Sequence, residues 1–289
     1  MGKILKGIGG FYYVKSDTDD KIIECKAKGK FRNISLKPYV GDDVDVEYTE
    51  ECKGCISEIH PRKNCFIRPP VANIDQLVIV CSCHNPEPDF GFIDKMIVTC
   101  KSKNVEAVIC LNKTDLATND EIQSIASVYK NIGIEVIETS NKSQSGKDQL
   151  KKLLAGKITA FSGFSGVGKS TLLNSILGTD NLETGEVSKK IGRGRHTTRH
   201  VELIEFSGGY VIDTPGFGSL EIFDVEPEDL KKYFDEFEKY ECDCKFPNCL
   251  HLGTKLCGVY DAVSEGNISK TRYENYKEFY KILKEKKEW

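Results

Sequence analysis

The sequence predicts a multidomain protein with an N-terminal all-β barrel, a central α/β domain built on a parallel sheet, and a small α-helical C-terminal domain. Short, partly alternating apolar stretches separated by turn residues fill the segment before residue 66. Continuous apolar runs alternating with helix-like stretches follow Pro69-Pro70. Beyond residue 222 the chain becomes acidic and then rich in cysteine. A length of 289 residues suits two or three domains, and we expect them at 1–66, 67–222 and 223–289.

The composition is that of an ordinary folded protein, with 39% hydrophobic and 29% charged residues. The formal net charge is −3, so any contact with nucleic acid must come from local basic patches. The sequence has no run of about 18 apolar residues and no signal-peptide core after Met1, so we expect a cytoplasmic protein without membrane spans. In that compartment the 12 cysteines favour metal ligands or buried thiols over disulfides.

The N-terminal segment has the turn pattern of a small barrel, of which the OB-fold is one case. Turn residues separate its short strands at 9–10, 17–20, 28–30 and 41–43. Such a barrel can present a face to RNA. A run of basic side chains would suit that face: Lys26, Lys28, Lys30, Arg32 and Lys37. A solvated charged surface explains the same run equally well.

The central segment alternates buried strands with helices. Its continuous apolar runs lie at 77–81, 107–111, 134–137 and 158–161. Its helix-like stretches lie at about 90–103, 120–131, 147–155 and 169–178. Strands that are apolar on both faces and separated by helices predict a parallel sheet covered on both sides.

A glycine-rich loop at 163–170 fits the phosphate-binding pattern G-x-x-x-x-G-K-[ST]. An apolar strand precedes it and a helical stretch follows, which is the context that the motif requires. Its backbone N–H groups and the helix N-terminus would surround phosphate oxygens. We expect Lys169 to reach the β- and γ-phosphates and Ser170 to bind Mg²⁺. The phosphate-site candidates are Gly163, Phe164, Ser165, Gly166, Val167, Gly168, Lys169, Ser170 and Thr171.

A second polar motif, Asn112-Lys113-Thr114-Asp115, follows the buried strand 107–111. The Asp115 carboxylate can accept two hydrogen bonds from guanine N1–H and N2–H, a pair that adenine does not offer. Asn112 would brace the loop and Lys113 would lie along the base. The segment Ser140-Asn141-Lys142, after the strand 134–137, occupies the place of a loop that backs the base, although a simple turn would give the same pattern.

Two further segments fit the switch elements that surround a γ-phosphate. Asp213 ends an apolar strand, where it would hold Mg²⁺ through water, and the Gly216 N–H would face the γ-phosphate. The glycine- and arginine-rich loop 192–199 carries Thr197 and Thr198. One of these threonines would bind Mg²⁺; the sequence does not decide which, and we favour Thr198. The arginines of the loop 192–199 are explained equally well by a generic basic loop.

These elements stand in a rotated order. In the usual GTPase layout the phosphate loop comes first and Asn-Lys-x-Asp comes late, whereas here 112–115 and 140–142 precede 163–170, and 213–216 comes last. The order predicts a circular permutation of the domain, which folded domains tolerate because their termini lie at the surface and often close together.

With this order the sequence resembles the circularly permuted, small-subunit-dependent ribosome-biogenesis GTPases of the RsgA/YjeQ family. The matching segments are 73–77, 112–115, 163–171, 192–198 and 213–217, together with a cysteine cluster near the C-terminus. The resemblance implies an N-terminal OB-fold, a permuted GTPase domain and a C-terminal zinc domain. It also implies GTP hydrolysis stimulated by the small ribosomal subunit during late maturation, with GTP or GDP, Mg²⁺ and one structural Zn²⁺ as cofactors. The expected partners are that subunit and its rRNA, and we expect a monomer.

The C-terminal cluster Cys244-x₄-Cys249-x-His251-x₅-Cys257 offers three thiolates and one imidazole, a closed structural zinc set. Cys242 is a rival to Cys244, and the family spacing selects Cys244. The segment 81–84, Cys-Ser-Cys-His, departs from the small or hydroxyl residues expected of the family, and we interpret it as packing at a strand end. We likewise interpret Cys52-x-x-Cys55 as structural, because no helix pattern follows it.

Phe217 stands where Ras-type GTPases carry the glutamine that orients the attacking water. An apolar side chain cannot do so, which predicts slow intrinsic hydrolysis and a partner that completes the site. His196 is our candidate for orienting water, although a histidine that contacts backbone or RNA fits nearly as well. The motif order also suggests that nucleotide state tilts the C-terminal domain, because the Asp213 segment runs directly into it.

Two other functions compete with this one. In the first, the chain is an RNA-binding assembly factor in which GTP acts only as a conformational lock; single-turnover hydrolysis with and without small subunits separates the two. In the second, the chain is a small-molecule kinase with a phosphate loop, which Asp115 and the threonine-bearing loop disfavour.

Overall fold

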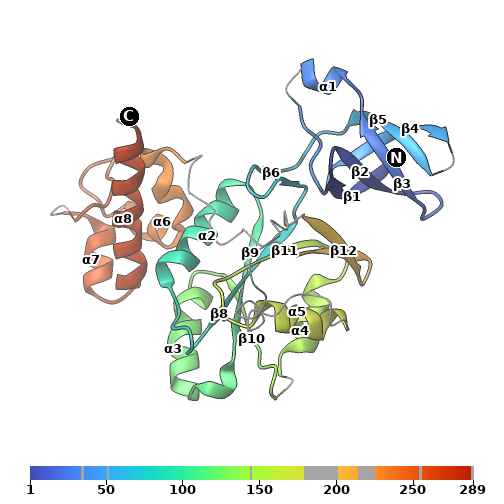
Figure 1. The fold of residues 1–289 in the computed structure, drawn as a ribbon. Coiled ribbons are helices and arrows are strands. Elements are labelled where there is room, and N and C mark those ends of the chain that lie inside the picture. The colour runs from blue at the N-terminus through green and yellow to red at the C-terminus, as the bar shows by residue number, and fades with distance from the viewer. Residues whose placement is uncertain are drawn as a thin grey trace, which may run out of the picture.

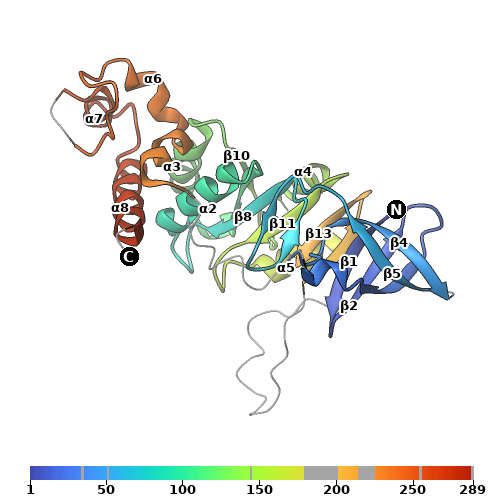
Figure 2. The same ribbon diagram turned by 90° about the horizontal axis from the view of Figure 1, so that it is seen from above.

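The computed structural model describes residues 1–33, 36–50, 52–143, 145–178, 201–213, 225–253 and 256–287. It has three parts, and the N-terminal barrel and the C-terminal module lie at opposite ends of the central domain (Figures 1 and 2). This arrangement confirms the predicted fold class: a barrel, a permuted α/β domain and a small helical module with a Cys/His cluster.

The N-terminal part is a closed barrel of five strands. These are β1 (Gly2–Ile8), β2 (Phe11–Ser16), β3 (Ile22–Ala27), β4 (Asp43–Glu50) and β5 (Lys53–Ile59). The strands pair in the order β1-β2-β3-β5-β4, and β4 returns to β1; only the β3–β5 pair is parallel. The helix α1 (Lys30–Asn33) joins β3 to β4, and its Phe31 packs in the barrel core. Alternate side chains of the strands fill that core: Ile4, Val14, Ile23, Val44 and Ile56.

The central sheet has the strand order β10-β9-β8-β11-β13-β12. Its strands are β8 (Gln76–Ser82), β9 (Glu106–Asn112), β10 (Glu135–Glu138), β11 (Ile158–Ser162), β12 (Glu202–Phe206) and β13 (Gly209–Asp213). All are parallel except β12, which forms an antiparallel hairpin with β13. The carboxyl ends of the five parallel strands therefore meet along one edge, where α/β sheets bind ligands.

Helices cover both faces of this sheet because successive side chains of each strand point to opposite sides. The helices α2 (Phe90–Ser102) and α3 (Asn119–Lys130) share one hydrophobic cluster with Leu77 and Ile79 of β8. The helices α4 (Lys147–Leu154) and α5 (Lys169–Leu177) share another cluster with Val78 and Val80. Between β9 and α3 lies the short 3₁₀ turn η1 (Thr114–Leu116). The helix-like stretches expected from the sequence match these four helices to within about two residues.

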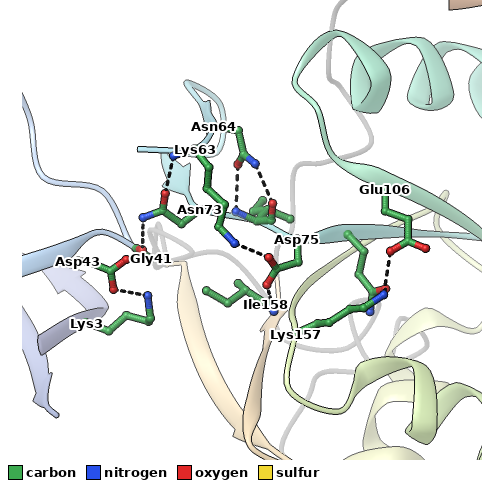
Figure 3. A network of polar contacts seen from close by, with 12 residues as sticks. Lys3, Gly41, Asp43, Lys63, Asn64, Asn73, Asp75, Glu106, Lys157 and Ile158 are labelled. Atoms are coloured by element: carbon green, nitrogen blue, oxygen red, sulfur yellow. Dashed lines mark hydrogen bonds and ion pairs between the residues drawn. The ribbon is translucent and has the colours of Figure 1, made fainter. Parts of the chain in front are cut away.

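A polar strap joins the barrel to the central domain (Figure 3). It runs through the small hairpin of β6 (Cys65–Phe66) and β7 (Val71–Ala72). The buried Asn73 amide accepts from the Lys63 N–H at 3.0 Å and donates to the Gly41 carbonyl of the barrel at 3.0 Å. Asp75 accepts from the Ile158 N–H at 2.7 Å and also pairs with Lys63. The strap therefore reaches from the barrel to the first residue of β11.

The barrel also extends the central sheet directly. Strand β1 pairs antiparallel with β12 through Lys6 and Glu202, whose side chains form an ion pair at 2.7 Å. Lys15 of β2 adds a second ion pair with Glu205 of β12.

The C-terminal module begins with the 3₁₀ helices η4 (Pro227–Tyr233) and η5 (Asp235–Phe237) and continues with α6 (Glu238–Glu241), α7 (Gly258–Ser264) and α8 (Lys270–Lys287). Helix α8 lies beside α2 (Figure 1). The buried Arg272 of α8 donates to Asp94 of α2 at 2.5 Å and to Glu236 of η5 at 2.5 Å. Tyr273 and Tyr276 of the same helix belong to the module's hydrophobic cluster. None of the helices in the described ranges has both the length and the apolar character that a membrane span requires.

Candidate nucleotide site and candidate metal centre

The glycine-rich loop lies between β11 and α5 at the carboxyl edge of the sheet. Gly166 and Gly168 have φ values of 87° and 90°, in the left-handed region that glycine adopts without strain. A Cβ on Gly163 would lie 2.4 Å from the Val80 carbonyl oxygen, and a Cβ on Gly168 would lie 2.6 Å from Asn112 Nδ2. A side chain at either position would clash, so both positions require glycine. The loop leads directly into the N-terminus of the nine-residue helix α5, which therefore faces it.

Asn112 connects the second motif to this loop. Its buried side chain donates from Nδ2 to the Val167 carbonyl at 2.9 Å. Its Oδ1 accepts from the hydroxyl of Thr139 at 3.0 Å. Because Thr139 directly precedes the third motif, one amide holds the loops after β9, β10 and β11 together.

The other residues of the second and third motifs contact the glycine-rich loop or one another. Lys113 has a φ of 60°, and its Nζ donates to the carbonyls of Gly166, at 2.6 Å, and of Asn85. The Ser140 hydroxyl donates to Asp115 Oδ1 at 2.5 Å and accepts from the Lys142 N–H at 3.2 Å.

Thr114 donates to the Thr139 carbonyl from its N–H and from its hydroxyl, both at 3.2 Å, which joins the second motif to the third. Asn141 lies between Ser140 and Lys142 in that third loop. The structure thus brings together Asn112, Lys113, Thr114, Asp115, Ser140, Asn141 and Lys142 beside the loop 163–171.

Phe164 of the glycine-rich loop is 42% exposed and packs against Phe92 of α2, with ring centroids 4.4 Å apart. Asp213 is the last residue of β13 and pairs in register with Glu202 of β12. His196, Thr197, Thr198, Gly216 and Phe217 lie outside the described residues.

The C-terminal module contains a second candidate site. The ligand atoms of Cys244, Cys249, His251 and Cys257 all lie within 4.8 Å of one another. The Cys244 and Cys257 sulfurs are 3.9 Å apart, and His251 Nδ1 lies 3.6 Å and 3.5 Å from them. Zn–S bonds of about 2.3 Å and Zn–N bonds of about 2.0 Å in a tetrahedron require separations of about 3.8 Å and 3.5 Å. The donor set therefore fits a tetrahedral zinc ion.

The surroundings of these ligands suit a metal. His251 is 1% exposed, and burial lowers the pKa of its imidazole, which keeps the ring in the neutral form that binds metals. The Tyr260 N–H donates to the Cys257 sulfur at 3.4 Å, which favours the thiolate that binds metals and acts against the burial that raises the pKa of this thiol to about 12. Cys242, the rival ligand, is exposed, and its sulfur lies 3.8 Å from Asp243 Oδ1.

Several residues in these sites carried no recognisable signal in the sequence. Thr139 lies beside an expected motif, but a single hydroxyl residue at a strand end is common. Phe92 lies on α2, whose contact with the glycine-rich loop depends on tertiary packing. Cys81 and Cys83, interpreted from the sequence as packing residues, are buried.

The rotated order of these loops on a parallel sheet defines the class: a circularly permuted P-loop GTPase. The family model described as RsgA GTPase matches residues 59–223, and the RsgA N-terminal domain matches residues 1–56. The chain belongs to the RsgA GTPase family.

Individual relatives match along nearly the whole chain. A Caldanaerobacter subterraneus subsp. tengcongensis protein named small ribosomal subunit biogenesis GTPase RsgA is 46% identical over 287 residues, covering 99% of this chain and 96% of that protein. The crystal structure of YjeQ from Thermotoga maritima matches with a TM-score of 0.83 and 37% identity, covering 98% of this chain and 97% of that one. The structure of YloQ, described as a circularly permuted GTPase, matches with a TM-score of 0.81 and 38% identity, covering 99% and 95%.

Proposed function

We propose that this chain hydrolyses GTP to GDP and phosphate and acts in late assembly of the small ribosomal subunit, which stimulates the reaction. The observation that carries the proposal is the junction at Asn112, where the guanine-reading loop and the phosphate loop share one buried amide. The relatives are named for biogenesis of that subunit, which supports the choice of partner.

In this proposal each loop has a defined role. Asp115 accepts hydrogen bonds from the guanine N1–H and N2–H, and Ser140 holds its carboxylate in place. Backbone N–H groups of 163–170 and the side chain of Lys169 bind the β- and γ-phosphates. Ser170 and Thr198 would hold Mg²⁺, with Asp213 acting through water; the ion offsets negative charge on the phosphates.

Hydrolysis needs a water aligned with the γ-phosphorus; its oxygen forms the new P–O bond as the bond to the β,γ-bridging oxygen breaks. Phe217 offers this water no polar group, so we propose that the small subunit completes the site and that His196 orients the water. Full subunit-stimulated turnover in His196→Ala would contradict that role.

The remaining parts of the proposal concern the outer modules and the cellular setting. We propose domains at 1–66, 67–222 and 223–289, with rRNA contacts through the barrel and a structural zinc on Cys244, Cys249, His251 and Cys257. We further propose a cytoplasmic monomer.

The test is the GTP hydrolysis rate titrated with purified small subunits. We expect slow turnover alone and a saturable increase with subunits. Asp115→Asn should lose guanine selectivity and prefer xanthosine triphosphate, because the amide can donate to the xanthine O2 where guanine presents an N–H₂ group. Single-turnover rates that do not change with subunits would instead favour the conformational-lock function.

A further inference from the structure

Two charged side chains, Glu241 and Lys231, lie beside the candidate metal centre, on the side of His251 that faces away from the cysteines. The ring of His251 presents Nδ1 to the Cys244 and Cys257 sulfurs, so its Nε2 points away from them. On that far side Nε2 lies 3.0 Å from Glu241 Oε1, at the end of α6. A neutral imidazole carries one proton, and the carboxylate can only accept it. Glu241 therefore selects the tautomer with the proton on Nε2 and the free lone pair on Nδ1.

Lys231 of η4 is the second member of the pair. Its Nζ lies 3.1 Å from Glu241 Oε1 and donates to the backbone carbonyl of Cys249 at 3.3 Å. The pair thus touches two of the four candidate ligands, His251 through its ring and Cys249 through its backbone.

Other features of the module hold the same ligand segment. His251 itself has a φ of 54°, a costly conformation for this residue that its neighbours must maintain. The Tyr276 hydroxyl of α8 donates to the Leu250 carbonyl at 2.6 Å, between Cys249 and His251.

We infer that Glu241 and Lys231 form the outer sphere of the metal centre, Glu241 by fixing His251 for ligation through Nδ1 and Lys231 by holding Glu241 and the Cys249 backbone. The inference rests on the zinc site proposed above. The helix η4 is the first helix after β13 in the described part of the chain. The inference therefore places Lys231, a residue that supports the metal centre, on the first element of the C-terminal module.

Metal affinity of the full-length protein tests the inference. Zinc affinity from chelator competition and the absorption spectrum of the Co²⁺ form should be compared among Glu241→Ala, Glu241→Gln and Lys231→Met. We expect Glu241→Ala to bind about 10–100-fold more weakly. Lys231→Met should lose less, and Glu241→Gln, which keeps an oxygen acceptor, should retain most of the affinity.

Matched controls separate this effect from a general change of surface charge. Lys232→Met makes the same substitution one position along, where the side chain is 66% exposed and pairs with Asp229. Cys242→Ser removes the rival thiol. Both should bind zinc as the unmodified chain does.

Nitrogen NMR of the His251 ring gives a readout that needs no variant. In the zinc-loaded protein we expect metal on Nδ1 and the proton on Nε2. Ligation through Nε2, or normal zinc affinity in Glu241→Ala, would overturn the inference. Failure of the unmodified chain to bind one zinc would overturn the proposed zinc site itself.

Discussion

At the scale of single residues, the hydroxyl of Thr139 decides how the nucleotide loops meet. It donates to Asn112 Oδ1, so the amide must turn its N–H₂ group toward the Val167 carbonyl. Cys110 contacts the same hydroxyl at 3.2 Å, and all these side chains are buried. An amide that is held from both ends fixes the distance between the loop 112–115, which we propose reads guanine, and the glycine-rich loop.

Replacing Thr139 with valine keeps the shape of the side chain and removes the donor. A buried acceptor left without a partner costs about 1–3 kcal/mol. We expect Thr139→Val to weaken GDP and GTP binding by roughly tenfold, since about 1.4 kcal/mol corresponds to that factor. Titration of a fluorescent guanine nucleotide measures the effect. Thr139→Ser retains the hydroxyl and should bind normally; equal affinities in the valine and serine variants would contradict this role.

The sequence predicted Asn112, Asp115 and Ser140 as candidate base-binding residues because their types and spacing match chemistry that guanine requires. Thr139 was not predictable in this way. Its position depends on the register of β10 on β9, where Glu138 lies opposite Leu111 and the Thr139 N–H donates to the Leu111 carbonyl. Only the folded sheet brings that hydroxyl over Asn112.

At the scale of elements, the apolar runs and helix-like stretches predicted the strands and helices of the central sheet. The contact between α2 and α8 was not predictable from such patterns. Arg272 sits in a lysine-rich helix, where a basic residue ordinarily faces solvent, yet it is 1% exposed. Its partner Asp94 is separated from it by 178 positions in the chain.

Arg272, Asp94 and Glu236 form a buried charged cluster, the Arg272 cluster, at the boundary between the C-terminal module and the central domain. We predict that the loss of its cation destabilises this boundary. Arg272→Met would leave Asp94 and Glu236, which are 0% and 10% exposed, without their cation. Breaking a buried pair in this way costs about 3–5 kcal/mol. We expect faster amide hydrogen exchange in α2 and α8.

The loss of stability caused by Arg272→Met should be smaller at acidic pH. Burial raises the pKa of Asp94 even beside Arg272, and without the cation the protonated form would be favoured further. A protonated carboxyl needs no cation, so the variant recovers as pH falls. Lys281→Met, on the same helix at a side chain that is 77% exposed, is the control; equal exchange rates in both variants would rule out a structural role for the cluster.

At the scale of the whole molecule, the order of motifs predicted the permutation, but the sequence did not predict how the barrel is attached. Strand β1 pairs with β12 through Lys6 and Glu202, which lie 196 positions apart in the sequence. A single residue pair of this kind leaves no recognisable pattern in the sequence of either strand. The barrel is further held through Asn73 and through Asp75, which binds the start of β11, at the sheet edge opposite the nucleotide loops. It is thus tied to the central domain at two separate places.

The C-terminal module is attached differently, through the Arg272 cluster on α2 and through the chain that follows Asp213. Helix α2 also contacts the phosphate loop through Phe92 and Phe164. The attachments of the C-terminal module therefore lie next to the groups that would respond to a γ-phosphate. The barrel also pairs there, through Lys6 and Glu202 opposite Asp213, but its strap to β11 lies away from these groups and would hold it. We expect exchange of GDP for a GTP analogue to move the C-terminal module relative to the central domain and to leave the barrel in place.

Single-molecule energy transfer between pairs of labels tests this expectation. Labels at Asp20, Asp120 and Lys281 would report on the barrel, the central domain and the C-terminal module; they should be cysteine-independent because the chain has 12 cysteines. The Asp120–Lys281 distance should change with nucleotide and the Asp20–Asp120 distance should not. Asn73→Ala, which removes the partner of the Gly41 carbonyl, should broaden only the barrel distance and shows that the method would detect barrel motion. A fixed Asp120–Lys281 distance would mean that the nucleotide signal does not reach the C-terminal module, and that any response of the proposed ribosomal partner arises at the switch loops themselves.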